Sequence, residues 1–299
     1  MAEPLDLLAI GEVMAEIRQD ADVGFQVGFA GDTYNTAVYC ARARGRAGSV
    51  AYFSRVGTDP LSEQFMKQAE AEDLDTRYIT SIEERPIGIY AVATDATGER
   101  SFSYWRDSSA ARTLFAEADE NLPVARITYL SGITLAIMEP SARRRLMDKL
   151  AKLSSTGETQ VAFDSNYRPK LWENADVARD VMDEMWALTD IALPSVDDEM
   201  ALFGDSSEGD VVKRFASRAW KACAIKRGVQ GPISPTLPQR DTPRFTPAPK
   251  VVDTTAAGDS FNAGYLAAFL DGETEQACML AGHALAKLVV ASPGAIIAR

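Results

Sequence analysis

The residues best suited to chemistry lie at positions 253–261, which read Asp-Thr-Thr-Ala-Ala-Gly-Asp-Ser-Phe and open an apolar helical pattern. The small residues Ala256, Ala257 and Gly258 permit a tight bend, so backbone N–H groups can converge on an anion at the helix start. Asp259 beside them could accept a proton. An acidic first-turn residue also stabilises the helix dipole by about 0.3 to 1 kcal/mol, so the segment alone leaves Asp259 equally open to a capping role.

The motifs that the chain lacks narrow the chemistry. His283 is the only histidine, which excludes two-histidine metal sites and zinc proteases of the HExxH type. The sequence has no GxSxG elbow, no GxxxxGK[ST] loop and no GxGxxG loop. Because His283 lies in an apolar helical pattern, we interpret it as a packed residue. A general base is therefore expected to be a carboxylate, which favours Asp259.

The composition is typical of a globular protein with a sizeable core. The 299 residues, 46% of them hydrophobic, are enough for a sizeable core. The net charge of −12 argues against a nucleic-acid partner, although a nucleotide could be held where Mg²⁺ and a few arginines reverse the local field. Without a signal segment or an apolar run of about 18 residues, we expect no membrane association and a cytoplasmic location. The three separated cysteines predict buried, reduced thiols.

Short apolar runs alternate with helical patterns along most of the chain, which predicts an α/β fold with a mainly parallel central sheet. The expected strands are 5–10, 50–56, 127–131, 160–164, 191–193 and 222–226. The expected helices are 33–43, 61–71, 140–153, 176–188, 211–220, 261–270 and about 275–291. Six of the fourteen prolines lie between Pro232 and Pro249, so that stretch is expected to be an irregular loop or an edge hairpin.

A β-hairpin interrupts this alternation, with arms at 87–94 and 100–106 and a turn at 95–98. Residues 12–29 are also extended in character. We expect these segments to form a small β lid, inserted at about 12–30 and 86–106 into a single domain covering residues 1–299. No linker indicates an independently folding second domain.

Polar groups follow several of the predicted strands. Residues 28–36 form a glycine turn entering a helix, with Gly31, Asp32 and Asn35 at its start, where Asp32 or Thr33 could equally be an N-cap. Asn166 and Arg168 follow strand 160–164, at the sheet edge where ligands bind in open α/β folds, although a surface salt bridge would also explain Arg168.

Two more strands end in charged groups. The acids Asp197, Asp198 and Glu199 follow the strand at 191–193, where they could hold Mg²⁺ through water or simply cap a helix. The basic, glycine-punctuated turn at 226–231 could meet phosphates or a nucleotide base.

Taken in this order, the Gly31–Asn35 entry, the hairpin, the Asp164–Arg168 strand end and residues 253–261 resemble the ribokinase-like (PfkB) sugar kinases over essentially the whole chain. The last segment is similar to the DTxGAGDxF signature of that family. The resemblance implies a three-layer sandwich and transfer of the ATP γ-phosphoryl group to a sugar hydroxyl. The variant motifs are most similar to those of members that act on the sugar acid 2-keto-3-deoxygluconate, giving its 6-phosphate.

The resemblance also implies roles for individual residues. Asp259 would be the general base, and the backbone of Ala256, Ala257 and Gly258 an anion hole. The residues implied to bind the sugar are Gly31, Asp32, Asn35, Tyr90, Tyr104, Arg106, Arg168 and Asp259. Those implied to bind the nucleotide are Asn166, Ser195, Lys226, Arg227, Gly228, Gly231, Ala256, Ala257 and Gly258. Asp198 and Glu199 are the candidates for holding Mg²⁺, and a monovalent cation is a possible further cofactor.

Two residues depart from the family pattern. Asp198 takes the position of the glutamate in an Asn-x-x-Glu motif, and Ala256 replaces the first signature glycine; we expect Ala256 to keep φ below zero. Arg106 and Arg168 have the planar fork that suits a carboxylate, which favours an acid sugar over fructose or another ketose. A sugar-binding regulator without catalysis is the alternative of another class. Lids of this architecture often pair between subunits, so a homo-oligomer through the lid is expected.

Overall fold

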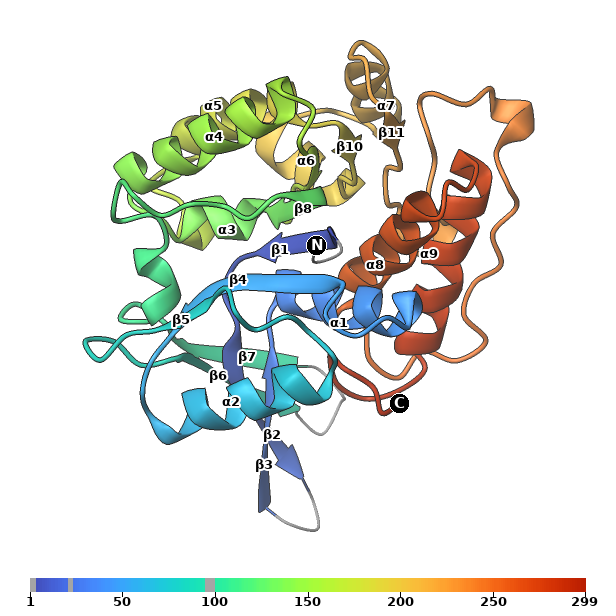
Figure 1. The fold of residues 1–299 in the computed structure, drawn as a ribbon. Helices are drawn as coiled ribbons and strands as arrows, with labels where there is room; N and C mark the ends of the chain where they lie inside the picture. Colours follow the sequence, from blue (N-terminus) through green and yellow to red (C-terminus); the bar gives the residue numbers. More distant parts are fainter. Residues whose placement is uncertain (1–3, 21–23, 95–99) are drawn as a thin grey trace.

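The central sheet is parallel throughout its described part. The computed structural model describes residues 4–20, 24–94 and 100–299. Within them, seven parallel strands lie in the order β11-β10-β9-β8-β1-β4-β5 (Figure 1). They are β1 (Leu5–Ile10), β4 (Val50–Val56), β5 (Ile79–Ser81), β8 (Ala125–Ser131), β9 (Gln160–Asp164), β10 (Ile191–Ala192) and β11 (Ala222–Cys223). This confirms the predicted α/β class.

Helices cover both faces of this sheet, which makes three layers. Alternate residues of a strand point to opposite faces, and accordingly Leu7 and Ala9 of β1 pack in one core while Leu8 and Ile10 pack in the other. The first core is covered by α1 (Asp32–Arg44), α2 (Pro60–Ala71), α8 (Ala257–Leu270) and α9 (Glu275–Val289). The second is covered by α3 (Gly132–Ala136), α4 (Pro140–Ser155), α5 (Ala175–Leu188), α6 (Val196–Phe203) and α7 (Glu208–Ala216) (Figure 1).

The predicted lid is a second sheet of order β3-β2-β6-β7. Its strands are β2 (Met14–Asp20), β3 (Gly24–Ala30), β6 (Gly88–Thr94) and β7 (Arg100–Trp105). The pair β2–β6 is parallel and the other two pairs are antiparallel, with Tyr90 directly opposite Tyr104. The lid projects from one edge of the main body (Figure 1). The turn predicted at 95–98 lies outside the described residues.

Several element bounds differ from those predicted. Strands β10 and β11 are shorter than expected, because after Ala192 and Cys223 only single bridges such as Ser195 to Lys226 continue the pairing. The expected glycine turn at residues 28–31 is wrong at its start, since β3 continues to Ala30. Helix α7 ends at Ala216, four residues before the predicted end. The short elements β5 and α3 were not predicted.

The remaining connections are irregular or form short 3-10 turns, at Ala110–Thr113, Pro169–Leu171, Gly228–Gln230 and Gln239–Asp241. The proline-rich stretch at 232–249 is mostly irregular, which confirms the loop alternative of the prediction; it contains the last of these turns and a single antiparallel bridge from Ile233 to Ile225. Cys40, Cys223 and Cys278 are buried free thiols, which confirms the prediction for them.

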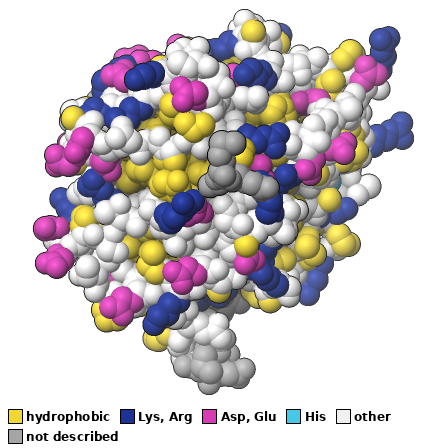
Figure 2. Space-filling view, in the orientation of Figure 1, with side chains coloured by type: hydrophobic (Ala, Val, Ile, Leu, Met, Phe, Trp, Pro, Cys, Tyr) yellow, Lys and Arg dark blue, Asp and Glu magenta, His cyan; other side chains and the backbone are white. Residues whose placement is uncertain are grey.

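The surface carries charges of both signs. Acidic and basic side chains are interspersed over the face in Figure 2, whose described part has no broad basic area. Among the described residues, none of the helices combines the length and the apolar character needed to cross a bilayer.

Candidate active site

Helix α8 starts with an unusual backbone conformation. Its N-cap residue, Ala256, has φ 59° and ψ 17°, in the left-handed region. The expectation that Ala256 keeps φ below zero is therefore wrong: the tight turn from Thr254 into the helix, closed by Ala257 N to Thr254 O at 3.2 Å, requires the conformation that glycine adopts most easily. The first intrahelical bond runs from Ser260 N to Ala256 O, so the N–H groups of Gly258 and Asp259 precede the helical ladder.

The Asp259 side chain is held from helix α1 and does not cap its own helix. Asn35 Nδ2 donates to Asp259 Oδ2 at 2.8 Å, and Thr36 Oγ1 donates to the Asp259 carbonyl at 3.2 Å. The pKa of Asp259 is raised to about 8, first by burial and then by the Asp32 carboxylate, while the Asn35 hydrogen bond opposes both. A carboxylate with a raised pKa, fixed beside a helix N-terminus, is suited to accept a proton.

A further polar contact holds Asp32, whose carboxylate raises the pKa of Asp259. Asn166 Nδ2 donates to Asp32 Oδ2 at 2.7 Å, which joins the end of β9 to the start of α1. Asp32 is the first residue of α1, and Gly31 is the N-cap residue. Asp32 and Thr33 therefore do not take the N-cap position that the sequence left open for them. Gly31 must be small, because a Cβ there would overlap the Glu12 carbonyl. The contact places Asn166 on the Asp32 side of the site, whereas its predicted role was in nucleotide binding.

A buried network lies behind Asp259. Lys226 Nζ contacts Asp164 Oδ2 at 2.5 Å and Asn262 Oδ1 at 3.1 Å. Asn262 Nδ2 donates to Asp164 Oδ2 at 2.7 Å and to the Tyr129 hydroxyl at 3.0 Å. Lys226 therefore places a positive charge among the carboxylates, close enough to the α8 turn that a Cβ on Gly258 would lie 3.7 Å from its ammonium. No local pattern in the sequence pointed to Asn262 or Tyr129 as members of this network.

A cavity of about 350 Å³ opens beside the start of α8. It brings together most of the residues predicted for the nucleotide, namely Ser195, Lys226, Arg227, Gly228, Gly231, Ala257 and Gly258. Its outer wall is the proline-rich loop, and His283 and Lys287 of α9 line it as well. His283 Nε2 lies 2.9 Å from the Thr246 carbonyl oxygen. The helical pattern around His283 predicted a packed residue, whereas the structure places it on the cavity wall; no local pattern could indicate this, because its partner belongs to an irregular loop 37 residues away.

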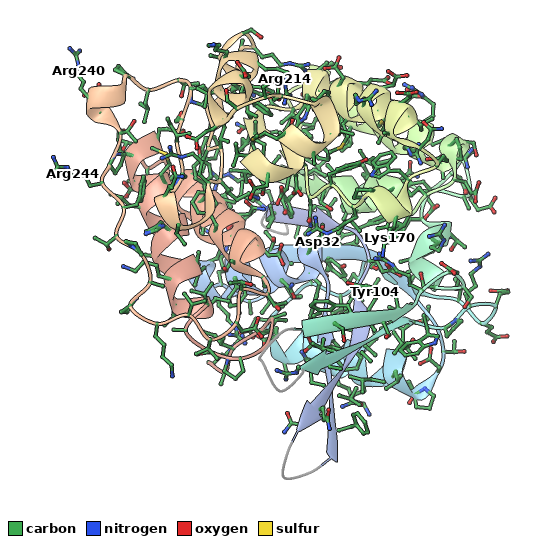
Figure 3. All side chains as sticks on the ribbon, turned by 180° about the vertical axis from the view of Figure 1, so that it is seen from behind. Asp32, Tyr104, Lys170, Arg214, Arg240 and Arg244 are labelled. Carbon is green, nitrogen blue, oxygen red and sulfur yellow. The ribbon has the colours of Figure 1, made fainter. Side chains whose placement is uncertain are left out.

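The residues predicted to bind the sugar lie around the lid and the start of α1. Tyr104, 53% exposed, stacks on the buried Tyr90 with ring centroids 5.8 Å apart. The Tyr90 hydroxyl donates to Glu16 Oε1 at 2.6 Å. Figure 3 shows Tyr104 on the lid sheet, below Asp32 and Lys170 in that view.

The two arginines expected to meet a carboxylate differ in their surroundings. Arg106 is buried and paired with Glu12. Arg168 is half exposed and donates to the Tyr167 carbonyl at 2.8 Å and to Asp198 Oδ1 at 3.4 Å. Asn35 and Asp32 of α1 thus act on Asp259, while Ala257 and Gly258 of the same turn line the cavity.

The two acids predicted to hold a metal ion behave differently. Glu199 is fully buried and its carboxylate pairs with Arg214 at 2.9 Å, so its predicted metal role does not fit this geometry. Arg214 lies far from Asp32 and Tyr104 (Figure 3). Asp198 is only partly buried; burial raises its pKa to about 6, which the nearby Arg168 opposes. The described residues contain no group of three or more His, Cys, Asp or Glu side chains that could hold a metal ion.

With this geometry in place, the comparisons with known proteins define the class. Residues 5–299 match the family described as pfkB family carbohydrate kinase, and the chain belongs to this family. It is 39% identical over 304 residues to the 2-dehydro-3-deoxygluconokinase of Escherichia coli (strain K12), covering 98% of this chain and 97% of that protein. The enzyme of the same name from Haemophilus influenzae is 37% identical, with coverages of 96% and 94%. A fructokinase from Klebsiella pneumoniae is 29% identical, with coverages of 86% and 82%.

Solved structures confirm the ribokinase-like fold. A fructokinase from Vibrio cholerae O395, with fructose, ADP and calcium bound, superposes with a TM-score of 0.82 at 22% identity, covering 97% of this chain and 94% of that one. A 2-dehydro-3-deoxygluconokinase from Thermotoga maritima gives a TM-score of 0.81 at 22% identity, with coverages of 98% and 96%. As a carbohydrate kinase, the chain uses a nucleoside triphosphate and a divalent metal ion.

Proposed function

We propose that this chain transfers the γ-phosphoryl group of ATP to the 6-hydroxyl of 2-keto-3-deoxygluconate, also called 2-dehydro-3-deoxygluconate. The observation that carries the proposal is the position of Asp259. Its carboxylate lies at the N-terminus of α8 and is oriented by Asn35, while Ala257 and Gly258 of the same turn line the cavity. A proton acceptor and an anion-binding turn therefore meet between the cavity and the lid. The identity to enzymes of this name supports the choice of sugar.

In the proposed reaction, Asp259 takes the proton of the sugar hydroxyl as its oxygen attacks the γ-phosphorus. The bond between this phosphorus and the oxygen bridging to ADP breaks, which releases ADP. The N–H groups that begin α8 face the negative charge of the transferred group, and the Lys226 ammonium lies beside the same turn. Positioning and charge stabilisation supply most of the rate in such transfers, so a rigid turn matters more than covalent chemistry.

We infer Mg²⁺ as the divalent ion, with Asp198 as the side chain that would hold it through water. When bound, such an ion neutralises phosphate charge. A monovalent cation stays a further proposal. We place the nucleotide base in the cavity between the 226–231 turn and α9, whose walls include Val229, Phe261 and His283.

We propose that Arg106 and Arg168 recognise the carboxylate of the sugar acid, and that the lid closes over the bound sugar. Arg168 has a half-exposed guanidinium that can turn toward a ligand, and the planar fork of arginine matches a carboxylate. Tyr90 and Tyr104 then provide the lid surface beside it. Exclusion of water by the lid would limit wasteful hydrolysis of ATP.

We also propose that the lid pairs between two copies of the chain in the cytoplasm. The lid exposes large apolar side chains, among them Phe25 (69% exposed) and Trp105 (60% exposed). The register places these two residues on the same face of the sheet, through Val27, Ile17, Ala91 and Ile89. Light scattering on the purified protein tests this proposal, because a monomer at micromolar concentration would contradict it.

The substrate is tested with a panel of sugars at fixed ATP and Mg²⁺, with ADP release as the readout. We expect 2-keto-3-deoxygluconate to give the highest kcat/KM, and a kcat/KM for fructose lower by about 10² or more, because fructose lacks the carboxylate that the arginines recognise. Equal turnover of fructose would replace the proposed function with that of a fructokinase. A chain that releases no ADP with any sugar would fit a non-catalytic sugar-binding protein.

A further inference from the structure

The ion pair between Glu12 and Arg106 lies where the lid joins the main body. Glu12 follows β1, and the chain enters the lid at Met14; Arg106 follows β7, and the chain leaves the lid there. Both side chains are buried, at 2% and 7% exposure, and Arg106 Nη2 contacts Glu12 Oε2. A buried guanidinium without a counter-charge would be strongly unfavourable, so Glu12 compensates the charge of Arg106 and holds its side chain in place.

The pair leaves part of the guanidinium unused. Among the described residues, Arg106 Nε and Glu12 Oε1 are buried and have no hydrogen-bond partner. The Arg106 guanidinium also lies 6.0 Å from the centre of the Tyr104 ring, and Tyr104 is exposed on the lid. Arg106 thus has donor capacity left beside the aromatic surface of the lid, where a ligand carboxylate could be received.

Glu12 itself is fixed by close packing from two more segments. A Cβ at Gly31 would overlap the Glu12 carbonyl oxygen, and a Cβ at Gly88 would lie 2.9 Å from Glu12 Oε1. Gly31 leads into the helix that carries Asn35, and Gly88 begins the strand that carries Tyr90. Glu12 is therefore the point where the lid strands, the start of α1 and Arg106 meet.

We propose that Glu12 is a positioning residue for acid-sugar recognition: it holds the Arg106 guanidinium so that its unpartnered Nε–H serves the carboxylate of the substrate. This inference rests on the proposed function. Glu12 acts through Arg106 and does not touch the sugar. Its loss should therefore weaken binding of the sugar acid and leave the nucleotide site unaffected.

The test is a double-mutant cycle with Glu12→Gln, Arg106→Gln and the double variant, measuring KM for 2-keto-3-deoxygluconate, KM for ATP and kcat. We expect Glu12→Gln to raise the KM for the sugar acid about tenfold, with the KM for ATP and kcat within about twofold of wild type. If Glu12 works through Arg106, the double variant is no worse than Arg106→Gln alone. Additive losses in the double variant would overturn the proposal.

A matched control exists elsewhere in the molecule. Glu120 and Arg55 form a pair at 2.8 Å that is less deeply buried, with side chains 16% and 14% exposed, but it also has an unpartnered Arg Nε and an unpartnered carboxylate oxygen, and it lies near the 3-10 turn that includes Thr113. Glu120→Gln should leave the KM for the sugar acid unchanged. Equal effects of the two variants on this KM and on thermal stability would reduce Glu12 to a structural role and overturn the proposal.

Two further measurements separate failure of this proposal from misfolding of the variant and from failure of the proposed function. If Glu12→Gln does not fold, Glu12→Asp keeps the charge but shortens the side chain by one methylene, and it should still raise the KM for the sugar acid; an unchanged KM would contradict the proposal. A wild-type enzyme that does not phosphorylate the sugar acid refutes the proposed function itself. If the wild-type enzyme phosphorylates the sugar acid but the effects of the Glu12 and Arg106 substitutions on its KM are additive, only the role of Glu12 is refuted.

Discussion

Asn35 Nδ2 lies 2.8 Å from Asp259 Oδ2, although the two residues are 224 positions apart in the chain. The contact joins the first turn of α1 to the first turn of α8. Helix α1 therefore orients the carboxylate of Asp259, the predicted base on α8. A hydrogen bond donated to a carboxylate favours its charged form. Asn35 therefore opposes the rise in the Asp259 pKa that burial and Asp32 cause.

The first prediction concerns the base itself. Asp259→Asn keeps the shape of the side chain but cannot accept a proton, so we expect kcat to fall by about 10² or more, with thermal stability and ATP binding retained. Steady-state kinetics and calorimetric titration with ATP provide the measurements. Asp119→Asn, at an exposed acid, is the matched control. Turnover near the wild-type value in Asp259→Asn would remove Asp259 from the role of base.

The second prediction is a pH dependence. Asp259 acts in its deprotonated form and its pKa is raised to about 8, so kcat/KM should fall as the pH drops through that region. Asn35→Leu removes the donor that stabilises the charged carboxylate, which raises the Asp259 pKa further. The acid limb of the profile should then move to higher pH. A limb that stays in place, or moves to lower pH, would contradict the link between the two residues.

The third prediction concerns backbone strain. Ala256 adopts a left-handed conformation that costs an L-residue about 1 to 2 kcal/mol, whereas glycine adopts it freely. Glycine also loses more conformational entropy on folding than alanine does, which offsets part of this gain. We therefore expect Ala256→Gly to raise the free energy of unfolding by about 0.5 to 1 kcal/mol. Chemical denaturation measures the change, and Ala257→Gly, inside the helix, should have the opposite sign. Destabilisation by Ala256→Gly would show that the strain is absent.

The fourth prediction concerns the buried cation. Lys226→Met keeps the length of the side chain but leaves Asp164 without its charge partner and removes an ammonium beside the α8 turn. We expect kcat/KM for ATP to fall by about 10² or more, because the anion-binding turn loses its neighbouring positive charge. Lys221→Met, at an exposed lysine paired with Asp190, is the control and should be neutral. Equal kinetics for the two variants would contradict a role for Lys226 in phosphoryl transfer.

Local patterns identified most of the framework. The bounds of β1, β4 and β9 agree with the predicted ones, because each is a short apolar run of strand length followed by turn or polar residues. The lid was also predictable, since its second arm alternates polar and aromatic residues. β5 was not, because it has three residues and only Ile79 is buried in it. The predicted helix begins at residue 261, whereas α8 begins at Ala257. The small residues at 256–258 do not distinguish a loop from a first helical turn.

The sequence by itself determined the chain's chemistry: a carboxylate beside small residues at a helix start, a basic glycine turn and two arginines after strands. These are properties of residue type and local spacing, which read directly from the chain. Only the tertiary structure decided which groups meet. The contacts of Asn35 with Asp259, Asn166 with Asp32 and Glu12 with Arg106 join residues 94 to 224 positions apart. Their geometry, and with it the raised pKa of Asp259 and the strain at Ala256, follows from how the strand ends and helix starts pack together, which no local pattern specifies.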